Sequence, residues 1–122
     1  NYLKTSRQMV HNIAPLIENY PSSYSNWLDI YTHLSGSFYE LAIVGEDAIQ
    51  KIKEVNKHYI PNKVICGRVS DIKNKSFSEN EAEFPLLKNR FIQGSTMIYV
   101  CVNNSCNFPT NDSSIALKQL SN

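Results

Sequence analysis

The segment FYELAIVG, residues 38–45, constrains the fold of this chain more than any other part of its sequence. Residues 41–44 are continuously apolar, which is typical of a central strand that is covered on both faces. Gly45 follows directly and suits a tight turn. We therefore expect a buried strand that ends in a turn.

A helix and a second strand follow the first strand. Glu46 and Asp47 suit the positive N-terminal end of a helix that runs from about residue 46 to 58, before the Pro-Asn pair that ends it. The segment KVICGRV, residues 63–69, predicts the second strand. Because strands joined by a crossover helix pair in parallel, we expect a parallel β-α-β unit.

The rest of the chain adds helices at both ends and one more strand. Helical spacing predicts two helices within residues 1–36, and TMIYVCV, residues 96–102, predicts a third strand before a last helix at 113–120. We predict an α/β fold, a small three-layer sandwich of about three mainly parallel strands with helices on both faces, preceded by two helices. We interpret residues 1–122 as a single domain, in which the helical segment 1–36 precedes an α/β unit, 37–122.

Composition narrows the choice of compartment and partner. The 122 residues carry a formal charge of +1, and no run approaches the ~20 apolar residues of a membrane span, so we expect neither a nucleic-acid nor a membrane partner. Three cysteines are too few for a disulfide scaffold, which favours a reducing compartment and a cytoplasmic location. The opening NYLKTSRQMVHNIAPL lacks the features of a signal peptide. We expect it to be a helix within a longer protein, kinked or broken near Pro15.

Three segments carry a resemblance to a known family: ELAIVG at 40–45, YIPNKVICG at 59–67 and PLLKNRFIQGSTMIYVCVNNSCNFPT at 85–110. Together they resemble the C-terminal region of the YyaL-type proteins, also called the spermatogenesis-associated, thioredoxin-domain-containing family. The resemblance implies a parent with a thioredoxin-like domain, a central (α/α)6 toroid of six helical hairpins, like those of sugar epimerases and glycosidases, and a small C-terminal α/β unit. It implies that residues 1–36 end the toroid, and that the partners are the remaining domains of the same chain. It implies no particular reaction.

Cys101 and Cys106 are the candidate redox residues. Cys101 lies near the end of the third predicted strand, and Cys106 follows an Asn-Asn-Ser turn. A disulfide needs Cα atoms about 4.4–6.8 Å apart, so this turn would have to fold back. The pair could be structural, an oxidisable thiol pair, or part of a metal site, although the few remaining Cys and His residues are scattered. Cys66, within a strand, is more typical of a small buried residue.

Gly45, Gly67 and Asn103 are the candidate ligand-binding residues, because they follow or end predicted strands, where α/β folds bind small molecules. A single Gly turn is much weaker than a G-x-G-x-x-G pattern, and the acidic residues after Gly45 would repel an anion. Glu40 and Arg90 precede strands. Either could reach a cleft at the sheet edge, although such residues are more often solvated or paired with each other. The sequence indicates no catalytic residue, no metal ligand set and no cofactor.

Three functions remain open. The first is a non-catalytic accessory domain at the C-terminus of a larger YyaL-like protein of unestablished activity. The second is a thiol–disulfide role, in which Cys101 and Cys106 exchange with the thioredoxin-like domain of the parent. The third is a small-molecule or nucleotide binding module.

Overall fold

The computed structural model describes residues 2–69 and 84–120. The chain forms two compact units, Asn1–Phe38 and Tyr39–Asn122, so the boundary falls two residues after the one expected at 36/37. The first unit is helical and the second contains all the strands described. In the described part of the chain, no helix is both long and apolar enough to cross a membrane.

The helical unit consists of α1 (Tyr2–Asn19), a 3-10 turn η1 (Pro21–Tyr24) and α2 (Ser25–Ser35). The break expected near Pro15 does not occur, because α1 continues through this residue to Asn19. A proline in a helix removes one backbone hydrogen bond, and the remaining bonds hold the helix on either side of it.

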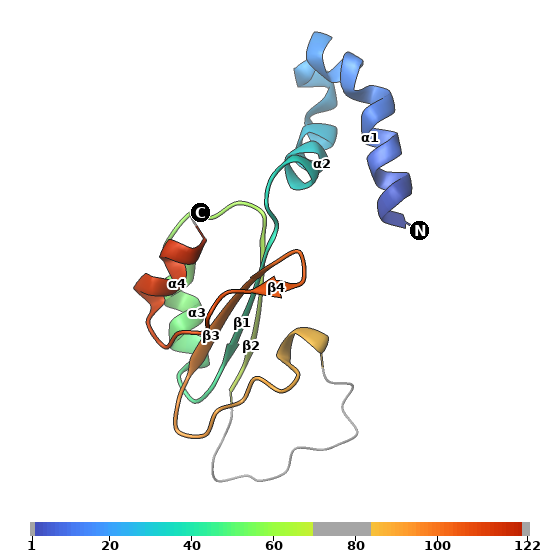
Figure 1. Cartoon of the computed structure of the whole chain (residues 1–122). Coiled ribbons are helices and arrows are strands. Elements are labelled where there is room, and N and C mark those ends of the chain that lie inside the picture. The colour runs from blue at the N-terminus through green and yellow to red at the C-terminus, as the bar shows by residue number, and fades with distance from the viewer. Residues whose placement is uncertain (1, 70–83, 121–122) are drawn as a thin grey trace. The chain divides into compact units, whose positions relative to one another are not determined.

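The second unit contains a four-stranded sheet in the order β2-β1-β3-β4 (Figure 1). Its strands are β1 (Tyr39–Val44), β2 (Lys63–Arg68), β3 (Met97–Val102) and β4 (Ser105–Cys106). β1 pairs with β2 in parallel, as expected from the crossover helix. β3 pairs antiparallel with both β1 and β4. The α/β class is confirmed. Only one of the three strand pairs is parallel, so the predicted mainly parallel sheet is corrected to a mixed sheet.

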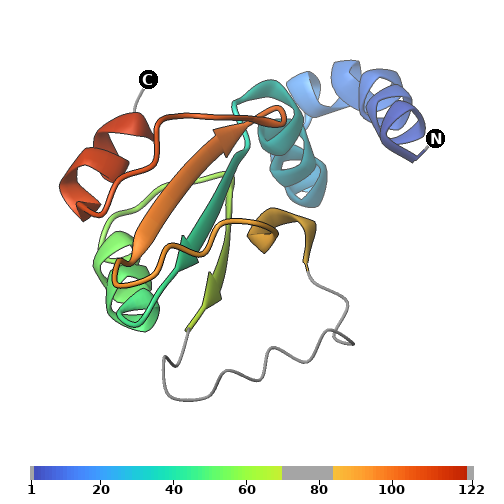
Figure 2. The ribbon, with the colours of Figure 1, turned by 60° about the horizontal axis from the view of Figure 1, so that its bottom comes forward.

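The helices α3 (Ala48–Asn56) and α4 (Ser113–Gln119) lie on the same face of this sheet (Figures 1 and 2). They share one apolar core with the strands, formed by Leu41, Ile43, Ala48, Val55, Ile98, Val100, Ala116 and Leu120. Leu41, Ile43, Ile98 and Val100 are fully buried in it. Among the described residues of this unit, the α-helices cover this one face of the sheet.

The opposite face of the sheet carries the alternate residues of each strand. The short 3-10 turn η2 (Pro85–Leu87) packs there against β1 and β2, and Figure 2 shows it across the sheet from α3 and α4. Ala42 is fully buried on this face, while Glu40 and Cys66 are partly exposed. The cover on this side is thinner than a helical layer, and the face holds the candidate site.

A polar contact joins the two helices on the core face. The Ser113 hydroxyl donates to Oε2 of Glu54 at 2.5 Å, and Nε2 of Gln50 donates to Oε1 of the same carboxylate at 3.3 Å. These two bonds, the one from Ser113 first, hold the pKa of Glu54 below its ordinary value. A carboxylate whose pKa is lowered by folding stabilises the fold above its unfolded-state pKa and loses that contribution as the pH falls.

We predict that Ser113→Ala raises the pKa of Glu54 towards its ordinary value, because the strongest donor to the carboxylate is removed. The stabilisation by Glu54 should then be lost at a higher pH during acidification. A carboxyl-detected NMR titration of Glu54 measures the change, and Ser114→Ala is the matched control. An unchanged pKa of Glu54 in Ser113→Ala would show that the contact between the helices does not form in solution.

Candidate functional site

A two-residue hairpin brings the candidate redox cysteines together. Asn103 and Asn104 form the turn between β3 and β4, with φ angles of 52° and 64°. Positive φ at both central positions characterises a type I′ turn, the geometry that suits the twist of a hairpin, and asparagine tolerates it better than most residues. The turn places Cys101 directly opposite Cys106 in the strand register.

Cys101 and Cys106 are linked by a disulfide, and their Cα atoms are 3.9 Å apart, closer than the usual range of about 4.4–6.8 Å. The turn therefore folds back, as a disulfide between these two positions requires. Cys66 is a free thiol on β2. Among the residues described, no group of three or more Cys, His, Asp or Glu side chains is placed to hold a metal ion.

The two cysteines of the disulfide differ in exposure. Cys101 lies on the central part of the sheet and is only 1% exposed, whereas Cys106 lies on the two-residue edge strand and is exposed. Thiol–disulfide exchange depends on which sulfur can be reached. An incoming thiolate would therefore meet Cys106, and Cys101 would be the leaving group.

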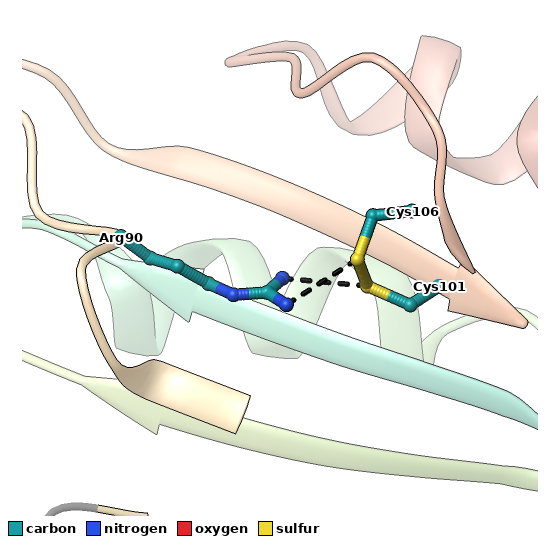
Figure 3. Close-up of a disulfide and its surroundings, with 3 residues drawn as sticks. All are labelled: Arg90, Cys101 and Cys106. Atoms are coloured by element: carbon teal, nitrogen blue, oxygen red, sulfur yellow. Dashed lines mark hydrogen bonds between the residues drawn. A yellow bond between two sulfur atoms is a disulfide. The ribbon is translucent and has the colours of Figure 1, made fainter. Parts of the chain in front are cut away.

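The side chain of Arg90 lies against both sulfur atoms (Figure 3). Its Nη1 is 3.3 Å from Sγ of Cys101, and its Nη2 is 3.3 Å from Sγ of Cys106. The guanidinium carbon of Arg90 also lies 4.8 Å from the centroid of the Tyr99 ring. The Tyr99 hydroxyl also donates to the backbone oxygen of Arg90 at 3.0 Å. A fixed positive charge therefore lies beside the disulfide.

This contact changes the interpretation of Arg90. An ion pair with Glu40 was one expectation, but no such pair occurs within the described part of the chain, and the guanidinium contacts sulfur and the Tyr99 ring instead. Strand alternation predicts that Tyr99 shares a face of β3 with Cys101, because it lies two residues before that cysteine. Its contact with Arg90 was not predicted.

A hollow of ≈ 430 Å³ lies beside the disulfide on this face of the sheet. Its lining combines apolar side chains from β2 and η2 with polar groups from β1, the hairpin and the segment after η2. The lining residues are Glu40, Val64, Cys66, Phe84, Pro85, Leu86, Arg90, Cys101, Asn104 and Cys106. The site thus has a disulfide, a cation and a space beside them.

The candidate ligand-binding glycines serve packing in this structure. A Cβ on Gly45, whose φ is +144°, would lie 2.4 Å from Cα of Thr96, and a Cβ on Gly67 would lie 2.4 Å from Cδ1 of Ile52. At the turn after β1, the N–H of Gly45 donates to the oxygen of Arg68, and the N–H of Asp47 to the Thr96 hydroxyl. These donors are already used within the chain.

Asn103 does not join the two glycines at one site. It is exposed in the hairpin turn, and its left-handed backbone accounts for an asparagine there. Asn104, the second turn residue, is the one that lines the hollow. The structure therefore brings Cys101, Cys106 and Arg90 together, and leaves Gly45, Gly67 and Asn103 outside the lining of that hollow.

Fold and site together define a small α/β unit with a mixed sheet that carries a disulfide flanked by an arginine. No family model, no curated protein and no solved structure matches the chain. The resemblance to the YyaL-type family accordingly stays a prediction.

We predict that Gly45→Ala destabilises the second unit more than Gly67→Ala. At position 45 the new Cβ would meet rigid backbone with an unfavourable φ, which costs about 3 kcal/mol. At position 67 it would meet the flexible end of Ile52, which can move, at about 1 kcal/mol. Urea denaturation of the two variants measures both free energies of unfolding. Equal losses would contradict the close approach of Gly45 to Thr96.

Proposed function

We propose that the α/β unit takes part in thiol–disulfide exchange through Cys101 and Cys106, with a dithiol protein as its reaction partner. The observation that carries the proposal is the guanidinium of Arg90, which lies 3.3 Å from each sulfur. Arginine beside a cysteine favours the thiolate, which is the species that exchange reactions consume and release. The exposure of Cys106 supports an approach from solvent.

Reduction proceeds in two steps. A thiolate of the partner attacks Sγ of Cys106, the bond between Cys106 and Cys101 breaks, and its electron pair leaves on Sγ of Cys101. The second thiol of the partner then loses its proton and attacks the partner's own sulfur in the mixed disulfide, which releases Cys106. The partner ends as a disulfide and the unit as a dithiol, so two electrons and two protons pass from partner to unit. The reverse reaction oxidises the unit.

Arg90 acts on the charge that develops in the first step. The negative charge appears on Cys101, which is buried and otherwise poorly solvated. A charge-assisted hydrogen bond there contributes about 1.5–3 kcal/mol, and 1.4 kcal/mol corresponds to about tenfold in rate. Removal of the guanidinium should therefore slow the opening of the disulfide by roughly tenfold.

A purely structural role explains the disulfide less well. The stabilisation that a disulfide provides grows with the length of the loop it closes, and this link spans a sequence separation of 5. The chain-entropy model gives about 2 kcal/mol for so short a loop. The Asn103–Asn104 turn already closes the hairpin. A further backbone hydrogen bond, from the Asn107 N–H to the oxygen of Val100 at 2.9 Å, joins its two arms. The hairpin therefore has other supports.

The wider setting follows from the resemblance and is part of the proposal. The unit would be an accessory domain of a YyaL-like protein, and the thioredoxin-like domain of the same chain would be its dithiol partner. We place it in the cytoplasm, where disulfides are usually transient and serve in catalysis or redox sensing.

A second candidate function is that of a non-catalytic accessory domain, and the helical unit favours it. Among the described residues of that unit, only Val10 and Ile17 are buried and apolar, whereas large apolar side chains such as Tyr20 (64% exposed) and Leu16 (44% exposed) are open to solvent. Helices with an exposed apolar side usually pack against further helices. In this function the α/β unit would stabilise a helical toroid without chemistry of its own.

We predict that Arg90→Met slows reduction of the Cys101–Cys106 disulfide by a small dithiol about tenfold, because the leaving thiolate loses its cation. Lys88→Met is the matched control, since it removes the same charge from an exposed position of the same segment. Stopped-flow kinetics with mass-spectrometric assignment of the cysteines gives both rates. Equal rates in the two variants would exclude a role for Arg90, and a disulfide that opens only on unfolding would exclude exchange altogether.

A further inference from the structure

The carboxylate of Glu40 lines the hollow beside the disulfide, and neither the fold nor the exchange reaction uses it. Glu40 lies directly opposite Cys101 in the register of β1 with β3, and opposite Val64 in the register of β1 with β2. Directly opposed residues have Cβ atoms about 4.5–5.5 Å apart. The carboxylate is therefore built into the floor of the hollow, next to the disulfide.

The carboxylate of Glu40 forms no ion pair in the described part of the chain, although Arg90 lines the same hollow. Glu40 is partly buried. The nearby cation, Arg90, lies against the sulfurs and the ring of Tyr99. A partly buried carboxylate without a partner attracts a cation from outside the chain.

One side of the hollow is apolar. Val64 is 40% exposed and Phe84 is 66% exposed, and Pro85 and Leu86 complete this side. Exposed apolar side chains around a recess commonly mark an interaction site. The hollow, at ≈ 430 Å³, falls in the range of pockets for small groups, which suits a pair of side chains from a partner.

We propose that this hollow selects the thiol partner of the disulfide by receiving a basic side chain and an apolar side chain that flank the partner's attacking cysteine. The basic group pairs with Glu40, and the apolar group packs against Val64, Phe84 and Leu86. The partner's sulfur then lies beside Cys106, the exposed end of the disulfide. This inference rests on the proposed exchange function and adds the chemistry of the partner's segment.

The test uses three blocked peptides, Leu-Cys-Lys, Leu-Cys-Gln and Leu-Cys-Glu, with the full chain carrying Cys66→Ser so that only the disulfide can react. The measured quantity is the rate at which each peptide forms a mixed disulfide on Cys106, at equal thiolate concentration and low salt, read by mass spectrometry. We expect the Lys peptide to react about fivefold faster than the Gln peptide, and the Glu peptide more slowly still, since an ion pair of this exposure contributes up to ~1 kcal/mol. Salt should reduce the differences.

Glu40→Gln should abolish most of this preference when the rate of each peptide is divided by the rate of neutral 2-mercaptoethanol with the same variant. This ratio removes any change that the lost carboxylate causes in the reactivity of the disulfide itself. Glu46→Gln, an exposed carboxylate outside the hollow, should keep the preference. Equal rates for the three peptides, or a preference that survives in Glu40→Gln, would overturn the selection by Glu40 while exchange itself stands. A folded protein whose disulfide reacts with none of the thiols would overturn both the exchange function and this inference.

Discussion

The site depends on the pairing of β1, which lies between β2 and β3 and fixes which side chains share each face of the sheet. Its register places Leu41 and Ile43 towards the helices, and Glu40 and Ala42 towards the thinner cover. The same register places Glu40 opposite Cys101. A slip by one residue would exchange the two faces, so the register that forms the apolar core also forms the site around the disulfide. Burial of the apolar face fixes the register of the strands, and this register places Glu40 beside the disulfide.

The chemistry of the site comes from the contrast between a rigid hairpin and the charges around it. The Asn-Asn turn and the disulfide set the sulfurs in place, and Tyr99 holds Arg90 against them. One cysteine is buried beside a cation and the other is exposed, which separates the leaving sulfur from the attacked sulfur. This asymmetry makes the disulfide suited to exchange with a partner, whereas a uniformly buried link would suit a structural role.

Local patterns predicted much of this structure from the sequence. The apolar run at 41–44, the crossover helix and the parallel pairing of β1 with β2 could be predicted, and so could the approach of Cys101 to Cys106 if the turn folded back. The direction of β3 could not, because the sequence between β2 and β3 shows no pattern of a crossover helix, and without such a helix either direction is permitted. The contact of Arg90 with the sulfurs could not be predicted either, because it depends on how the segment after η2 crosses the sheet.

The central claim is that Cys101 and Cys106 form a reversible two-electron couple in the folded protein. The most direct measurement equilibrates the native chain with a series of dithiol–disulfide buffers, traps the free thiols by alkylation and assigns them by mass spectrometry, while NMR follows the fold. The account predicts that Cys101 and Cys106 gain or lose their link together, reversibly and without unfolding of the α/β unit, and that Cys66 stays a free thiol throughout. Cysteines that never link in the folded protein, or a link that opens only when the unit unfolds, would contradict it.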